Sequence, residues 1–437
     1  MREGDIVNIA VVGLGHIGLP LAAQYASKGH RVFGCDINPA VVEMVNAGRA
    51  YDDEPGLHER VNAAVSAGLL TAQTTTREAV RLADAVVIIV PLVVDANKDI
   101  AYGAIDSATR DVAAGLQPGT LVIYETTLPV GDTRNRFGRL LQEGSGLTPG
   151  QDFFLAFSPE RVYVGRVFED LRRYPKIVGG IDPESTGRAV AFYRAVLDAE
   201  VTAVDNAETA EFTKLAETTY RDVNIALANE FARFAEAHGI DVLQSIDAAN
   251  SQPFSHIHRP GAGVGGHCIP VYPYFYANRT DDARVARLAR DVNDGMAAHL
   301  VSRLGEVLGG LDGRTVAIFG WAYRENVKED AFTVAARLLQ ALRDAGARVV
   351  VHDPLYGDEE LRARGLQPYQ SDSPEPVEAV IVQAAHREYL TFDWSSVPGL
   401  RVLLDGRNAL DPARLPAHVA YLGVGRRSAA LDVARAG

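Results

Sequence analysis

Apolar runs that break at glycine alternate with stretches of helical spacing at both ends of the chain. Near the N-terminus, VNIAVVG is followed by LPLAAQYASKG, where apolar residues recur every three or four positions, and then by RVFGCD. Strand, turn, helix and strand within about 30 residues is the pattern of a βαβ unit in a parallel sheet. The later runs DAVVIIV (84–90) and TLVIYET (120–126) are apolar on both faces, which is typical of strands covered on both sides.

The C-terminal part repeats this scheme. RTVAIFGWA predicts a strand that ends at Gly320, TVAARLLQALRDAGA predicts an amphipathic helix, and RVVVHD predicts a strand that ends at Asp353. EAVIVQAA and LRVLLDGRN indicate later strands of the same sheet. The similarity therefore lies between two α/β domains, and no tandem repeat of solenoid length is present.

The middle of the chain has a different pattern. From Asn206 to Gly239 there is no proline and no internal glycine, and apolar residues recur at helical spacing. This predicts one long helix that stops at Gly239. We therefore expect an α/β fold in which two Rossmann-like, doubly wound parallel-sheet domains are joined by a long central helix. The expected domains are 1–203, 204–300 and 301–437, and we expect a homodimer through the helix.

Composition and charge narrow the classes of function. The chain has 437 residues, 47% of them hydrophobic, and a net charge of -13, which argues against a nucleic-acid surface or an anionic membrane as a partner. No apolar run approaches the roughly 20 residues of a membrane span. Two cysteines form no disulfide framework, and nothing resembles a signal peptide. We therefore expect a cytoplasmic protein.

The first strand leads into a nucleotide-binding motif. Gly13, Gly15 and Gly18 form G-x-G-x-x-G between a predicted strand and a predicted helix. The first glycine allows a tight turn, the second a close approach of a pyrophosphate, and the third close helix packing. Asp36 ends the next strand, where a carboxylate binds ribose hydroxyls and repels a 2′-phosphate. We therefore expect NAD here rather than NADP; a glycine-rich turn without a ligand is the alternative.

One cysteine follows a second glycine-rich segment, GAGVGGHCIP, which ends in Cys268 and Pro270. A thiol that faces NAD and a substrate adds to an aldehyde, and the thiohemiacetal then loses a second hydride to give a thioester. Such a thiol needs cationic or amide-rich surroundings, which His267 and the glycine amides would provide. From the segment alone, an inert buried cysteine is an equally good interpretation.

With these motifs in place, the chain resembles the nucleotide-sugar 6-dehydrogenases, also called the UDP-glucose/GDP-mannose dehydrogenase family. The segments that carry the resemblance are VVGLGHIGLPLA, LPVGDTR, FSPERV, EFTKLAETTYRDVNIALANE, GVGGHCIPV, GWAYRENVKED and LLDGRN, in the order and spacing of the family. The resemblance implies oxidation of the C6 hydroxymethyl of an NDP-hexose to a carboxylate with two NAD+ in succession. The last domain would bind the NDP-sugar.

The resemblance also implies a role for particular residues. Cys268 matches the thiol nucleophile, and Lys214 matches a lysine that stabilises the oxyanion. Glu160 resembles the glutamate of thioester hydrolysis, and Thr127 a threonine that holds a catalytic water. Each residue alone suits an ordinary structural role, but together they favour a catalytic one.

The expected binding residues fall into two sets. The NAD site comprises Gly13, Gly15, His16, Ile17, Gly18, Asp36, Pro91 and Thr127. The substrate site comprises Glu160, Arg161, Val162, Lys214, Thr218, Arg221, Asn224, Arg259, Gly263, Gly265, Gly266, Tyr272, Arg324 and Lys328, with Glu230 on the same helix face.

The sequence departs from the family pattern near the expected chemistry. Tyr272 stands where the family usually has an aspartate, and Thr218 where it usually has asparagine. The loop VPLVVD (90–95) replaces VPTP, and AFT (331–333) replaces an arginine-glutamate-serine segment. A phenol donates and accepts hydrogen bonds but is a poor base at pH 7. Arg324 or Lys328 is expected to replace the missing arginine.

The sequence leaves three hypotheses for the activity. The first is four-electron oxidation of a UDP-N-acetylhexosamine (UDP-GlcNAc or UDP-ManNAc) or of UDP- or dTDP-glucose. The second is a two-electron dehydrogenase, which would not need Cys268 or a third domain. The third is a non-catalytic NDP-sugar-binding relative, suggested by Tyr272 and Thr218. The spacing of His256, His258 and His267 matches no zinc site, so no metal is expected.

Overall fold

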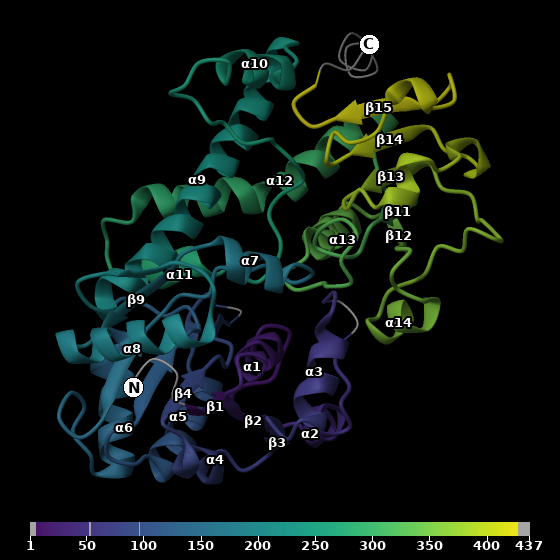
Figure 1. The fold of residues 1–437 in the computed structure, drawn as a ribbon. Helices are drawn as coiled ribbons and strands as arrows, with labels where there is room; N and C mark the ends of the chain where they lie inside the picture. Colours follow the sequence, from purple (N-terminus) through teal and green to yellow (C-terminus); the bar gives the residue numbers. More distant parts are fainter. Residues whose placement is uncertain (1–5, 52–53, 96, 427–437) are drawn as a thin grey trace. The chain divides into compact units, whose positions relative to one another are not determined.

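The computed structural model describes residues 6–51, 54–95 and 97–426 (Figure 1). The chain divides into two compact units. Unit 1 comprises residues 1–217 and 274–280, and unit 2 comprises 218–273 and 281–437. No helix among the described residues is both long and apolar enough to cross a membrane.

Unit 1 contains an eight-stranded sheet in the order β10-β9-β8-β7-β4-β1-β2-β3. The strands are β1 (Asn8–Val12), β2 (Arg31–Cys35), β3 (Leu70–Gln73), β4 (Ala85–Ile88), β7 (Leu121–Tyr124), β8 (Phe154–Phe157), β9 (Lys176–Gly180) and β10 (Val201–Ala203). All neighbouring strands are parallel except β8 and β9, which are antiparallel. A two-stranded hairpin, β5 (Val93–Val94) and β6 (Ile100–Ala101), follows β4.

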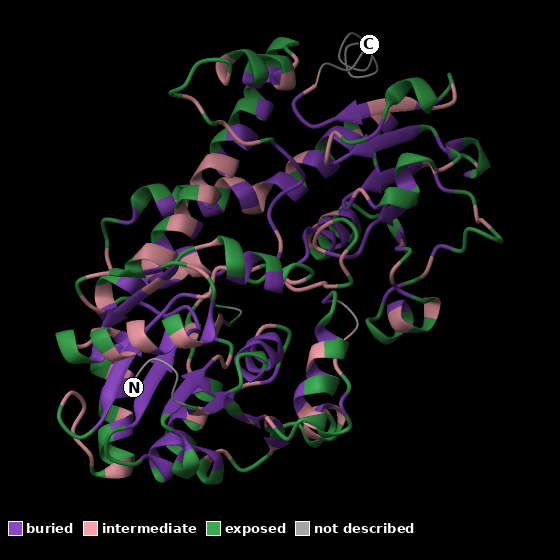
Figure 2. Cartoon of the chain, in the orientation of Figure 1, coloured by how far each residue is buried: buried purple, intermediate pink, exposed green. Residues whose placement is uncertain are grey.

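Helices surround this sheet. They are α1 (Gly18–Ser27), α2 (Pro39–Asn46), α3 (Leu57–Ser66), α4 (Thr76–Leu82), α5 (Gly103–Gly115), the π-helix η1 (Thr133–Phe137), α6 (Gly138–Ser145), α7 (Val167–Arg173) and α8 (Pro183–Val196). The middle strands β1, β4, β7 and β8 are buried along almost their whole length (Figure 2). The apolar runs that contain β4 and β7, predicted to be covered on both faces, are confirmed as such.

Unit 2 contains a five-stranded, fully parallel sheet in the order β12-β11-β13-β14-β15. The strands are β11 (Thr315–Phe319), β12 (Arg348–His352), β13 (Ala379–Val382), β14 (Val402–Asp405) and β15 (Ala420–Gly423). On β11, Val316 and Ile318 belong to one buried cluster, while Ala317 and Phe319 belong to another. Successive side chains of a strand point to opposite faces, so both faces of this sheet are covered.

The helices of the second half include one that continues across the boundary between the units. They are α9 (Ala207–His238), α10 (Val242–Ala249), α11 (Tyr272–Ala277), α12 (Arg284–Leu308), α13 (Val334–Asp344), α14 (Asp358–Ala363) and α15 (Arg387–Leu390), with short 3-10 turns η2 (Trp394–Ser396) and η3 (Pro412–Arg414). The predicted central helix is α9, which stops at Gly239 with φ +67°. Glycine adopts this left-handed conformation without steric cost.

Candidate active site

The G-x-G-x-x-G loop of unit 1 has the geometry that its glycines predict. Gly13 has φ +97°, and a Cβ on Gly18 would lie 1.8 Å from the Gly13 carbonyl oxygen. Neither position therefore accepts a side chain. A Cβ on Gly15 would meet no protein atom within 4 Å, so the backbone there faces open space. Helix α1 begins three residues later, at Gly18, so the amides at the N-terminus of this helix suit a pyrophosphate.

The carboxylate of Asp36 lies at the same edge of the sheet. Its Oδ2 accepts the Leu14 N–H at 2.9 Å, and its Oδ1 accepts the Asn38 N–H at 2.9 Å. Asp36 is therefore fixed against the glycine loop and remains half-buried, with further lone pairs for ribose hydroxyls. The loop and the acid together fit NAD. Cys35, the preceding residue, is inert: burial raises the pKa of its thiol to about 12.

The remaining residues predicted for the NAD site lie around these strand ends. His16 is exposed and stacks on Tyr51 at 4.5 Å, and Ile17 is half-buried against the core of unit 1. Pro91 is exposed just after β4, and Thr127 is buried just after β7. The Thr126 hydroxyl donates to the Val90 carbonyl at 2.7 Å, which holds these two segments side by side.

Glu160 and Lys214 are brought together in unit 1. The Lys214 Nζ donates to the backbone carbonyl of Glu160 at 2.6 Å, and both side chains are partly buried. The Glu160 Oε1 accepts the N–H groups of Arg161 and Val162 at 2.6 and 3.0 Å. The Arg161 guanidinium pairs with Glu217 at 2.6 Å. Two of the predicted catalytic residues, which are far apart in sequence, therefore contact one another.

Sequence reasoning missed two buried acids and a lysine in this unit. Lys176 bridges Glu125 and Glu160, with Nζ–O distances of 2.7 and 3.2 Å. Glu211, on α9, is buried and accepts the N–H groups of Gly131 and Thr133, and burial raises its pKa to about 7. Because each pair is separated by at least 16 residues in sequence, no local pattern indicates them.

The thiol loop belongs to unit 2, and Cys268 is exposed. Its glycines are required for packing. A Cβ on Gly266 would lie 2.9 Å from the Tyr323 ring, one on Gly265 would lie 3.0 Å from the Phe332 carbonyl oxygen, and Gly263 has φ +132°. The suggestion that the glycine amides surround the thiol is wrong for two of them. Gly261 N–H donates to the Asn229 side chain, and Gly266 N–H donates to the Ala331 carbonyl.

The other predicted substrate residues of unit 2 lie on α9, on α11 and between them. Thr218 is buried, whereas Arg221 and Asn224 are half-buried, and the Asn224 side chain donates to the Tyr220 carbonyl. Glu230 is exposed on the same helix. Arg259 is exposed and pairs with Asp247 at 2.5 Å. Tyr272 is half-buried, and its N–H donates to the Cys268 carbonyl at 2.9 Å.

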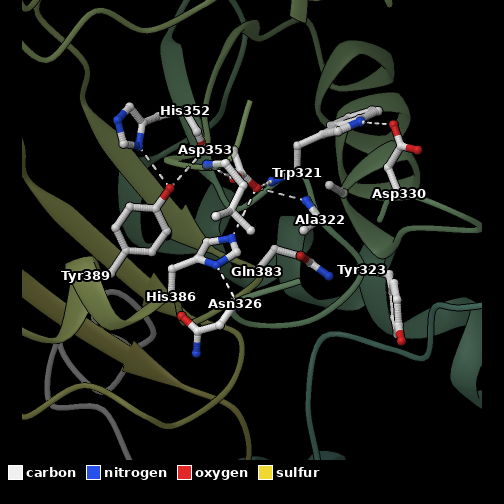
Figure 3. A network of polar contacts seen from close by, with 12 residues as sticks. Trp321, Ala322, Tyr323, Asn326, Asp330, His352, Asp353, Gln383, His386 and Tyr389 are labelled. Carbon is white, nitrogen blue, oxygen red and sulfur yellow. Dashed lines mark hydrogen bonds and ion pairs between the residues drawn. The ribbon is translucent and has the colours of Figure 1, made fainter. Parts of the chain in front are cut away.

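The strand ends of the second sheet hold a polar network of their own (Figure 3). The Asp353 Oδ2 accepts the N–H groups of Trp321 and Ala322 and the His386 Nε2–H, at 2.7, 2.9 and 3.1 Å. His386 Nδ1 accepts the Asn326 N–H at 2.9 Å, so the imidazole is neutral with its proton on Nε2. Burial raises the pKa of Asp353, but the bonds from His386 and the amides outweigh burial and lower it. The carboxylate is thus saturated by the protein itself.

Cations border this second edge. The Arg324 Nε donates to the Tyr323 hydroxyl at 2.9 Å, and Lys328 pairs with Glu360 at 2.7 Å. Sequence reasoning missed Arg407, which follows β14 and donates to the carbonyls of Gln383 and Tyr323. Burial lowers the pKa of Arg407. Glu325 and Asp405 act in the opposite direction. The two carbonyls leave further N–H groups of the guanidinium for an anionic ligand.

The predicted residues are therefore divided between the units. Thr127, Glu160 and Lys214 belong to unit 1, and Cys268 and Tyr272 belong to unit 2. Glu160 and Lys214 are two of the residues predicted to be catalytic, and their contact lies within unit 1.

Comparison with known families identifies known domains in both units. Residues 7–197 match the NAD binding domain of the UDP-glucose/GDP-mannose dehydrogenase family, 208–295 match its central domain, and 317–412 match its UDP binding domain. The chain belongs to this family. It is a nucleotide-sugar dehydrogenase, and NAD is its cofactor.

Individual relatives extend over nearly the whole chain. The UDP-N-acetyl-D-mannosamine dehydrogenase of Pyrococcus horikoshii is 35% identical over 430 residues, covering 96% of this chain and 99% of the relative. The enzyme of the same name from Salmonella typhimurium is 39% identical over 353 residues, covering 77% and 83%. A solved structure of the UDP-D-ManNAc dehydrogenase from Pyrococcus horikoshii has a TM-score of 0.88 at 34% identity, covering 96% of this chain and 99% of that one.

Proposed function

We propose that this protein oxidises the C6 hydroxymethyl group of a UDP-N-acetylhexosamine, with UDP-N-acetylmannosamine as the first candidate, to the uronic acid. The observation that carries the proposal is similarity along nearly the whole chain to enzymes named for UDP-N-acetyl-D-mannosamine. The exposed Cys268 supports a four-electron reaction, because a two-electron dehydrogenase does not need a thiol.

The proposed chemistry balances with one thiol and one water. Loss of a hydride and a proton converts the hydroxymethyl to an aldehyde, and the Cys268 sulfur adds to its carbonyl carbon to give a thiohemiacetal. Loss of a second hydride and proton gives a thioester. Water then attacks the acyl carbon, the C–S bond breaks, and the thiol and the carboxylate are released. NAD+, held by the glycine loop and Asp36, would supply the hydride acceptor for both oxidations, so two would be consumed per sugar.

Three residues of unit 1 would assist this sequence. Lys214 would stabilise the oxyanions of the intermediates with its charge. Thr127 would hold the attacking water, and Glu160 would act as its base. The contact between Lys214 and the Glu160 backbone supports a shared site, because it joins the lysine of α9 to the residue that carries the carboxylate.

The sugar nucleotide would lie between the thiol loop and the polar edge of the last domain. We assign it the substrate residues predicted from the sequence, and we add Arg407 for the phosphates because Lys328 already pairs with Glu360. Tyr272 would take the position of the family's aspartate as a hydrogen-bond partner of an oxyanion or a water, and not as a base.

We further propose three functional domains, 1–203, 204–300 and 301–437, and a homodimer through α9. In the part of this helix that belongs to unit 2, four large apolar side chains, Tyr220, Leu227, Phe231 and Phe234, are 39–59% exposed. They recur at helical spacing, as expected of a face that a second copy covers. A cytoplasmic location stays a prediction.

A second candidate is a two-electron or non-catalytic relative that binds the NDP-sugar. Tyr272 favours it, because the thiol then lacks a carboxylate at the family's usual position. The two candidates differ in the number of hydrides removed per sugar.

NADH yield at limiting sugar nucleotide tests the proposal. We would compare UDP-ManNAc, UDP-GlcNAc, UDP-glucose and dTDP-glucose, with Cys268→Ala as control. Two NADH per UDP-ManNAc, lost in the control, are expected. A single NADH, or two NADH that persist in the Cys268→Ala variant, would contradict the thioester route.

A further inference from the structure

A buried ion network lies behind Glu160, and the proposed mechanism does not yet use it. Lys176, the first residue of β9, has a side chain only 6% exposed, and its Nζ lies 2.7 Å from Glu125 Oε2 and 3.2 Å from Glu160 Oε2. Removing one partner of a buried ion pair is strongly destabilising, since it leaves an uncompensated charge. A network of this kind therefore fixes the groups that it joins.

Both carboxylate oxygens of Glu160 and its backbone carbonyl accept hydrogen bonds. Its Oε2 accepts from Lys176, its Oε1 accepts the N–H groups of Arg161 and Val162, and its backbone carbonyl accepts from Lys214. The carboxylate therefore has one orientation. Because Lys214 also bonds to Glu160, a displacement of Lys176 would shift the residue to which Lys214 is bonded.

Glu125 secures the other side of Lys176. Its side chain is fully buried, and its Oε1 accepts the hydroxyls of Tyr25 and Tyr193 at 3.1 and 2.6 Å. Its backbone carbonyl also accepts the Glu160 N–H at 3.3 Å. Glu125 thus contacts Glu160 through the backbone and, by way of Lys176, through the side chains.

Charge favours Glu160 as the ionised member of the pair. Two carboxylates share one buried lysine, so a single proton added to the group balances its charge. Burial raises the pKa of Glu125. Burial also raises the pKa of Glu160, but Lys176 and the hydrogen bonds from Glu125 and Arg161 outweigh it and lower the pKa overall. Lys176 and the Arg161 amide thus favour the ionised form of Glu160, whereas burial disfavours that of Glu125.

We propose that Lys176 and Glu125 are positioning residues, which hold the Glu160 carboxylate ionised and oriented for the attack of water on the Cys268 thioester. This inference rests on the proposed function. It predicts that loss of the lysine slows the hydrolytic step and leaves both hydride transfers intact. A purely structural network would affect every step alike.

The test uses Lys176→Met and Lys176→Gln, which remove the charge, and Lys176→Arg, which keeps it. Arg303→Met is the matched control, because Arg303 also forms a buried ion pair, with Glu236 at 2.7 Å, in unit 2. NADH release is followed from the first turnover with UDP-ManNAc, the intact mass of the quenched protein is measured, and thermal denaturation compares the stability of all variants.

We expect a burst of two NADH per active site from Lys176→Met, followed by a steady rate about 100-fold below that of the wild type. The quenched protein should carry the uronyl group on Cys268, and the KM of the sugar nucleotide should change less than about 3-fold, since only a step after binding is slowed. Lys176→Arg should restore most of the rate, and Arg303→Met should show neither burst nor adduct.

Two other outcomes are separable. If the wild type yields two NADH but neither Lys176→Met nor Lys176→Gln accumulates an acyl adduct, the inference is wrong and the proposed function stands. If the wild type yields fewer than two NADH per sugar, the proposed function falls and the inference falls with it. Lys176→Gln, which retains a donor, keeps the comparison valid if Lys176→Met does not fold.

Discussion

The sheets of the two units have the same turn after their first strand but different polar contacts at their strand ends. Gly13 and Gly320 follow the first strand of each sheet with φ +97° and +96°, and their N–H groups donate to the carbonyls of Cys35 and His352, both at 2.8 Å. In each sheet an aspartate, Asp36 or Asp353, comes directly after the second strand. The turn after the first strand therefore has the same glycine conformation and the same backbone hydrogen bond in both sheets.

The aspartates differ in what they accept. Asp36 takes one amide from the glycine loop and stays half-buried, so it can serve a ligand. Asp353 is buried, and its two oxygens accept Trp321, Ala322, His386 and Leu355. Only the first crossover also continues directly into a helix: α1 begins at Gly18, whereas α13 begins at Val334. The same turn is therefore followed by an available carboxylate in the first sheet and by a saturated one in the second, which is why we expect NAD at the first.

We expect the largest difference in stability between the two turns at Gly18, the third glycine of the motif. In Gly18→Ala, the new Cβ would lie 1.8 Å from a backbone oxygen and 2.8 Å from Ile89 Cγ2. We expect a loss of about 4 kcal/mol or more in the free energy of unfolding, measured by urea denaturation. Glu325, at the same spacing after Gly320, is exposed, so Glu325→Ala should change stability by less than about 0.5 kcal/mol. Equal losses would contradict the comparison.

The next effect is at the two acids. In Asp353→Asn, an amide NH2 group would face donors, so we expect a loss of about 2–4 kcal/mol in the free energy of unfolding. Asp36→Asn should cost less than about 1 kcal/mol, because the side chain is half-buried. Chemical denaturation of both variants checks this. A larger loss at Asp36 than at Asp353 would reverse the roles assigned to them.

A smaller effect is the dependence of the Asp353 contribution on pH. Because its pKa is lower in the folded protein than in the unfolded chain, the unfolded state binds more protons in acid. The stabilisation is therefore complete above the ordinary aspartate pKa of about 3.9 and is lost as pH falls through the folded pKa. The stability difference between wild type and Asp353→Asn should shrink below about pH 4 in urea titrations. A difference that stays constant with pH would show that Asp353 is not the group responsible.

The first crossover could be predicted from the sequence because its signals are local. Glycine spacing, a strand on each side and Asp36 at the strand end specify the NAD loop within one βαβ unit. The saturation of Asp353 could not be predicted, because its partner His386 is 33 residues away and the competing donors are backbone amides. The Lys176 network was missed for the same reason. Spacing alone also does not show that two of the glycines before Cys268, Gly265 and Gly266, provide space for Tyr323.

The most direct test of this account is calorimetric titration of NAD+ into the wild type, Asp36→Ala and Asp353→Asn. We predict one NAD+ site per chain. Asp36→Ala should weaken it about 10- to 100-fold, the loss expected for hydrogen bonds to a charged group, and Asp353→Asn should leave it unchanged. Two NAD+ sites per chain, or wild-type affinity in Asp36→Ala, would contradict the account.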